Sequence, residues 1–94
     1  MADFVLKKRK DFVFEIDGAK GQFTLPGRSS LSFDDVALFD RLRRTEADTT
    51  QRGNIIKEFI LKYAPGLEEL DLADMAYLDI MQAYEIAQGR ALGE

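Results

Sequence analysis

The sequence predicts an α+β domain, mainly helical, in which an N-terminal β-hairpin is followed by three α-helices. Two observations indicate this order. Near the N-terminus, two short stretches alternate apolar and other residues on either side of a glycine-containing turn, as paired strands do. Further on, three stretches place apolar residues three and four positions apart and begin or end at capping and breaking residues, as amphipathic helices do. A chain of 94 residues suffices for one domain, residues 1–94, with a single core.

Residues 1–10 precede the hairpin and are expected to form a basic N-terminal arm or an edge strand. They end in four adjacent cations, Lys7, Lys8, Arg9 and Lys10. Such a cluster can contact phosphates, but it lacks interleaved aromatic residues and any recognised nucleic-acid motif. Lysines on a strand edge also discourage pairing between chains. We therefore expect a solvated arm or edge here rather than nucleic-acid binding.

The hairpin is expected over residues 11–26. A tight Asp-Gly turn would pair Phe14 with Gly21, whereas a longer loop over residues 17–20 pairs Phe14 with Phe23. We expect the longer loop, because it keeps the apolar side chains on one face. A lone hairpin is marginal in water, so that face must lie against the helices. It comprises Phe12, Phe14, Ile16, Phe23 and Leu25.

The first two helices are expected over residues 33–45 and 49–64. Ser32 is placed to cap the first, with Asp35 at its third position, and Asp48 is placed to cap the second. Apolar residues at helical spacing are expected to face the core from both helices. These are Val36, Leu38, Phe39, Leu42, Ile55, Ile56, Phe59, Ile60 and Tyr63.

The last helix is expected over residues 71–88, with residues 89–94 as a frayed tail. The face expected to meet the core consists of Leu72, Ala73, Ala76, Tyr77, Ile80, Ala83, Tyr84 and Ala87. The opposite side carries Asp74, Gln82, Glu85 and Gln88. Leu78 and Met81 lie among these polar residues, with Met75 at the edge. This second side is either covered within the domain or kept for a partner.

Charge is distributed unevenly along the chain. Residues 1–62 carry 12 basic and 10 acidic side chains, whereas residues 63–94 carry 1 basic and 7 acidic side chains. The acidic C-terminal third is either a solvated face or a surface for a basic amphipathic partner.

The composition argues against catalysis. The chain has no cysteine and no histidine, so disulfides, thiolate chemistry, the commonest general base and the commonest metal ligand are all missing. The carboxylates around Asp71 and Asp74 lack the spacing of a calcium loop. We expect no enzyme, no cofactor and no metal site. No apolar run approaches the length of a membrane span, and Phe4-Val5-Leu6 is too short for a signal-peptide core, so we expect a cytoplasmic protein.

Several short stretches together resemble a known family. They are FTLP at residues 23–26, LSFDD at 31–35, ILKYAP at 60–65, LEEL at 67–70 and IMQAY at 80–84. Over most of residues 11–88 the chain resembles the tail assembly chaperones of long-tailed bacteriophages and prophages. The resemblance implies a non-catalytic protein of the bacterial host cytoplasm that binds the long, helical tape measure protein before the tail tube polymerises. It also implies a homo-oligomer and, as in many members, a longer form made by ribosomal frameshifting.

The resemblance has no motif tight enough to transfer binding residues, so the expected partner surface comes from the last helix alone. It consists of Met75, Leu78 and Met81, with Asp74 and Glu85 supplying solubility and orientation. Two other functions are compatible with the sequence. One is a small nucleic-acid-associated regulator that uses the Lys7 to Lys10 cluster, and the other is a structural connector that stays in the phage particle.

Overall fold

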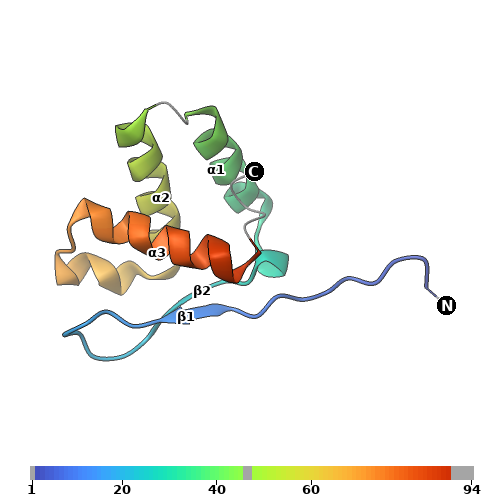
Figure 1. The fold of residues 1–94 in the computed structure, drawn as a ribbon, viewed down its shortest axis with the longest axis horizontal. Helices are drawn as coiled ribbons and strands as arrows, with labels where there is room; N and C mark the ends of the chain where they lie inside the picture. The colour runs from blue at the N-terminus through green and yellow to red at the C-terminus, as the bar shows by residue number, and fades with distance from the viewer. Residues whose placement is uncertain (1, 46–47, 90–94) are drawn as a thin grey trace.

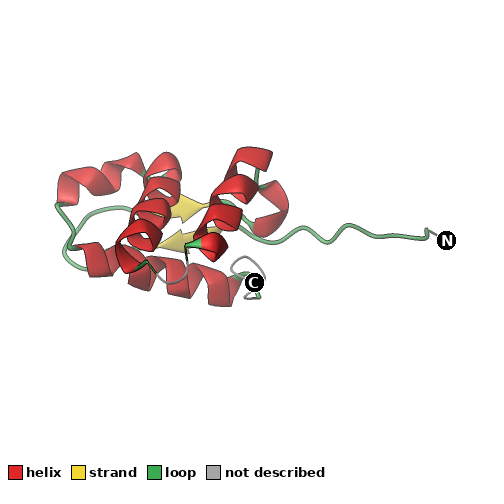
Figure 2. Ribbon diagram, turned by 90° about the horizontal axis from the view of Figure 1, so that it is seen from above, coloured by secondary structure: helices red, strands yellow, loops and turns green. Residues whose placement is uncertain are grey.

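The computed structural model describes residues 2–45 and 48–89, and it confirms an α+β fold with an N-terminal hairpin and three α-helices (Figure 1). The elements are β1 (Phe12–Phe14), β2 (Phe23–Leu25), the 3-10 helix η1 (Arg28–Ser30), α1 (Phe33–Arg44), α2 (Thr49–Tyr63), the 3-10 helix η2 (Pro65–Leu70) and α3 (Asp74–Ala87). The hairpin lies along one side of the helical layer (Figures 1 and 2). In the part of the chain that the structure describes, no helix is both long and apolar enough to cross a membrane.

The hairpin has the register that the apolar pattern predicts. Phe12 pairs with Leu25 and Phe14 with Phe23 in an antiparallel ladder. The connection over residues 15–22 is longer than expected, because the ladder stops at Phe14. The register brings the rings of Phe14 and Phe23 to a centroid separation of 5.7 Å. The predicted apolar face of the hairpin packs against the helical core, and Leu25 is fully buried.

Both predicted helix caps are present. The Asp35 amide donates to Ser32 Oγ over 3.2 Å, and the Ser32 amide donates to Asp35 Oδ2 over 3.0 Å, which completes a capping box. At the start of α2, the Gln51 amide donates to Asp48 Oδ1 over 3.0 Å. The expectation that Val36 faces the core is wrong, since Val36 is half exposed. The fully buried Asp35 takes that place on α1 instead.

The last helix begins later than predicted, and its buried face agrees with the prediction at Tyr77, Ile80 and Tyr84 but not at three alanines. Residues 65–70 form η2, Asp71 adopts a left-handed conformation with φ of 50°, and α3 starts only at Asp74. The alanines predicted to be buried at positions 73, 83 and 87 are exposed. The buried positions of the α3 segment are Tyr77, Ile80, Met81, Tyr84 and Gln88. The buried face of this segment therefore keeps both tyrosines and Ile80 and extends to Met81 and Gln88, whereas Met75 and Ile86 are exposed.

The core is centred on the aromatic ring of Phe59. This side chain is 1% exposed, and its ring centroid lies 4.9 Å from Phe39, 5.5 Å from Tyr63 and 5.7 Å from Tyr84. Leu42 and Ile80 belong to the same buried cluster, and Phe14 and Phe23 pack at its edge as predicted. The core thus joins the hairpin to all three α-helices.

The segment before β1 is extended and exposed, and only its base is anchored. The Gln88 side chain holds this base, because Nε2 donates to the Lys10 carbonyl over 3.1 Å while Oε1 accepts from the Arg28 amide over 2.8 Å. The Gly27 amide also donates to Asp11 Oδ1 over 2.9 Å. Gln88 was expected on the solvent side of the last helix, and the structure corrects this placement. Residues 90–94 of the predicted tail lie outside the described residues.

The close approach of the arm to Gly27 leads to a first prediction. A Cβ atom at Gly27 would collide with the backbone of Arg9 and would lie 2.8 Å from the Lys10 carbonyl oxygen. Gly27→Ala is therefore expected to displace the arm base and to cost about 1–2 kcal/mol through weakened hydrogen bonds. Gly53→Ala is the matched control, because a Cβ there meets nothing within 4 Å.

The control is expected to stabilise the domain by up to about 1 kcal/mol, since alanine is a better residue than glycine inside a helix. Urea unfolding of both variants measures the two effects. Equal stability changes for Gly27→Ala and Gly53→Ala would contradict the anchored arm base.

Candidate functional site

The structure separates the residues of the predicted partner surface. Met75 is 63% exposed and Leu78 is half-buried. Met81 is only 3% exposed and belongs to the core, so the expectation that it faces a partner is wrong. Asp74 is exposed in the first turn of α3, and Glu85 lies further along the helix and is partly buried.

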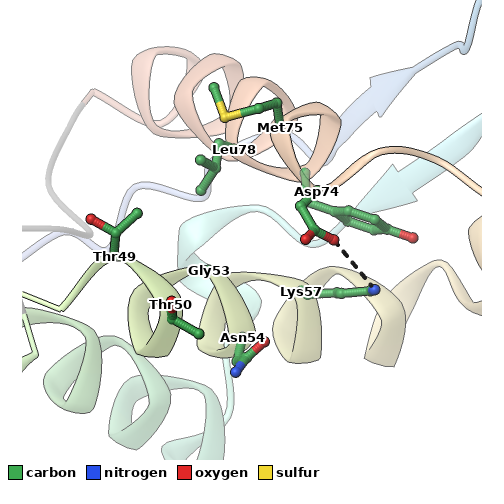
Figure 3. A pocket seen from close by; sticks show the side chains of 9 residues that line it. Thr49, Thr50, Gly53, Asn54, Lys57, Asp74, Met75 and Leu78 are labelled. Carbon is green, nitrogen blue, oxygen red and sulfur yellow. Dashed lines mark ion pairs between the residues drawn. The ribbon is translucent and has the colours of Figure 1, made fainter.

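A groove between α2 and the start of α3 brings three of these residues together (Figure 3). Its volume is about 200 Å³. It is lined by Thr49, Thr50, Gly53, Asn54 and Lys57 of α2 and by Asp74, Met75, Tyr77 and Leu78 of α3. Leu78 points from α3 toward α2 across the groove, and Glu85 is not among the lining residues. The part of the predicted surface that remains accessible is thus Asp74, Met75 and Leu78.

The groove exists because α2 presents small side chains where α3 presents large ones. Gly53 has no side chain, and no atom lies within 4 Å of the place its Cβ would occupy. Thr49, Thr50 and Asn54 around it are short and polar. The groove therefore has a polar wall on α2 and an apolar wall made by Met75 and Leu78 on α3.

One charged pair closes an end of the groove. Lys57 Nζ lies 3.8 Å from Asp74 Oδ1 and 5.2 Å from the centroid of the Tyr77 ring (Figure 3). The Asp74 side chain is 94% exposed, so solvent screens this ion pair and its net contribution to stability is small. Because the pair is weak, the Asp74 carboxylate can exchange Lys57 for a cation of a bound partner at little cost.

A second polar cluster, which the sequence did not single out, joins α1 to α2. The fully buried Asp35 accepts hydrogen bonds from Lys62 Nζ over 2.6 Å and from the Tyr63 hydroxyl, in addition to its capping bond. Burial by itself would raise the pKa of Asp35, but the hydrogen bonds from Lys62, Tyr63 and Ser32 outweigh it and lower that pKa below its ordinary value.

The protonation states of this cluster indicate a structural role. The hydrogen bond with Asp35 raises the pKa of Lys62, and burial raises the pKa of Tyr63. Near neutral pH the cluster therefore holds a carboxylate, an ammonium group and a neutral phenol. None of these groups titrates near pH 7, so the cluster is suited to clamp two helices rather than to transfer protons.

Metal chemistry finds no support in residues 2–45 and 48–89, where no group of three acidic side chains is arranged to hold an ion. Comparisons of the chain with protein-family models, with curated proteins and with solved structures found no match. The groove between α2 and α3 is the place where three of the predicted partner residues meet.

Proposed function

We propose that this protein is a non-catalytic tail assembly chaperone of a phage or prophage, which binds apolar helical segments of the tape measure protein in the bacterial cytoplasm. The observation that supports the proposal is the exposed Met75 beside the half-buried Leu78 in the groove. The resemblance of residues 11–88 to this family suggests the client, and a homo-oligomer and a frameshifted longer form belong to the same proposal.

The size and chemistry of the groove suit the anchoring side chains of a protein partner. Its volume of about 200 Å³ is below the roughly 300–1,000 Å³ of a typical small-molecule pocket. One or two apolar side chains on one face of a client helix enter it and contact Met75 and Leu78. Methionine is flexible and polarisable, so Met75 can adapt to different apolar partners along a long helical client. Asp74 at the rim faces basic residues of the client.

This proposal predicts the behaviour of an exposed-surface variant. Met75→Ser is expected to weaken client binding roughly tenfold or more, because apolar anchors carry most of the energy of an interface. Its melting temperature is expected to stay close to that of the parent, since exchanges of exposed residues usually change stability by less than about 0.5 kcal/mol. The measurement is the soluble fraction of the proposed client, a tape measure protein, when the two are co-expressed.

Ile86→Ser is the matched control. Ile86 is also an exposed aliphatic residue of α3, and it does not line the groove. Client solubility should fall with Met75→Ser and not with Ile86→Ser. Equal loss with both variants, or no loss with either, would remove the groove from the mechanism. A slippery run near the stop codon, followed by an overlapping reading frame, would support the longer form.

A further inference from the structure

The N-terminal arm, defined here as residues 2–10, carries an unusual pair of features. Phe4, Val5 and Leu6 are between 64% and 78% exposed, and the cations at positions 7–10 follow directly. The arm forms no strand or helix, and it extends away from the domain in both views (Figures 1 and 2). An apolar triplet held in water next to a dense positive charge is a surface that lacks a partner within its own domain.

The arm is directed away from its own groove. Its base is tied down where the Arg9 amide donates to Ser29 Oγ over 3.0 Å and where Gln88 binds the Lys10 carbonyl. Figure 1 shows η2, which leads into the groove side of α3, at the end of the domain opposite the arm. At about 3.3 Å per residue, residues 2–8 beyond this base can reach about 23 Å outward, which is far enough to lie along a neighbouring molecule.

Charge complementarity identifies the occupant of the groove. Residues 64–89 contain six acidic side chains and no lysine or arginine. Glu68 and Glu69 on η2 are exposed, and the Asp74 carboxylate lies at the rim of the groove beside the apolar Met75. The arm presents the matching combination of apolar residues and cations. The domain thus has an apolar and basic arm at one end and a partly apolar groove with neighbouring carboxylates at the other.

We propose that the arm of one copy docks in the groove between α2 and α3 of a second copy. Phe4 and Leu6 contact Met75 and Leu78, and Lys7 and Lys8 face Asp74 and the glutamates of η2. The inference rests on the proposed function in taking this groove as an interface, and it adds that the arm of a second copy occupies the groove before a client does. A client then binds by displacing the arm.

The charge pattern disfavours the other way in which two arms can meet. Pairing the extended arms of two copies as antiparallel strands that overlap at positions 7–10 would place cations opposite cations, which is repulsive. Docking beside Asp74 and the exposed glutamates of η2 relieves the same repulsion. Self-association is therefore expected to weaken as salt concentration rises, because exposed charges are screened.

A charge-exchange experiment on the purified full chain, without client, tests the docking. Lys7→Glu with Lys8→Glu should weaken self-association roughly tenfold or more in sedimentation equilibrium, because like charges then face each other. Glu69→Lys with Asp74→Lys should weaken it likewise. An equimolar mixture of the two double variants should associate again, since each arm then meets a groove of opposite charge. Lys20→Glu with Arg41→Glu has the same net charge as the arm variant and should associate like the parent.

The outcomes distinguish this inference from the proposed function. A parent chain that remains monomeric, an arm variant that associates normally, or a mixture that fails to associate would each overturn arm docking in the groove. Salt-dependent DNA binding by a monomeric parent would do so as well and would favour a nucleic-acid role for the cations. A monomeric parent would also remove the homo-oligomer from the proposed function, whereas client binding is tested separately by client solubility in co-expression with Met75→Ser.

Discussion

Replacing Phe59 with alanine is expected to lower the free energy of unfolding by roughly 3–5 kcal/mol, which is a large share of the stability of a small domain. Phe59 is 1% exposed and contacts the aromatic rings of Phe39, Tyr63 and Tyr84. Its removal leaves a cavity where the three α-helices meet, and the surrounding rings can fill that cavity only in part. Urea unfolding followed by circular dichroism measures the change.

Phe33→Ala is the matched control, because Phe33 is 95% exposed at the first position of α1. Its substitution removes the same side chain without opening a cavity, so the expected change is within about 0.5 kcal/mol. A loss of stability in Phe59→Ala no larger than in Phe33→Ala would show that the ring of Phe59 does not organise the core.

Replacing Asp35 with alanine is expected to lower the free energy of unfolding by roughly 2–4 kcal/mol. The substitution removes the capping acceptor of α1, and it leaves the Tyr63 hydroxyl and the Lys62 ammonium without their buried partner. Asp34→Ala is the control, since Asp34 also lies in the first turn of α1 but is exposed. An equal effect of the two substitutions would mean that Asp35 acts only through the helix dipole.

The same carboxylate predicts a pH dependence. Folding lowers the pKa of Asp35 below its ordinary value of 3.8, so its contribution to stability is complete above that value and is lost as the pH falls through the lower folded pKa. Asp35→Asn should therefore flatten the loss of stability of the parent below about pH 4. Parallel acid unfolding curves for the two proteins would contradict a stabilising role of the ionised Asp35 carboxylate between α1 and α2.

Local chemistry in the sequence was enough to predict the hairpin and the starts of two helices. The register follows from keeping Phe14 opposite Phe23, and Ser32 and Asp48 cap α1 and α2 through bonds to residues three positions away. Each of these features depends on neighbours along the chain or on a single pair of strands. That is why pattern alone identifies them.

The errors concern residues whose environment is decided by distant segments. Asp35 is buried where Val36 was expected. Its carboxylate can be buried because the Lys62 ammonium and the Tyr63 hydroxyl of α2 donate hydrogen bonds to it. Met81 and Gln88 are buried because α3 packs against α2 and its C-terminal end meets the arm base. A helical wheel ranks residues by polarity and does not record such partners.

The candidate groove was only half predictable. Met75, Leu78 and Asp74 were identified as surface residues of the last helix, but the α2 wall of the groove was not. Gly53 gave the available signal, since a glycine inside a helix leaves open space beside its neighbours. Whether another helix fills that space depends on where α3 begins, and the left-handed Asp71 and the preceding 3-10 turns set that start.

The two hydrogen bonds of the Gln88 amide connect it to positions 60 and 78 residues earlier in the chain. Closing such long loops costs chain entropy that only a largely folded domain can offset, so this junction forms late in folding. At a synthesis rate of about 5–20 residues per second, Gln88 is added to the chain roughly 4–16 s after Lys10. In the nascent chain the arm base therefore lacks its two hydrogen bonds with Gln88 while the hairpin and the first helices form. The anchoring of the arm base is complete only once α3 has been made, and exchange of arms between copies is expected after translation rather than on the ribosome.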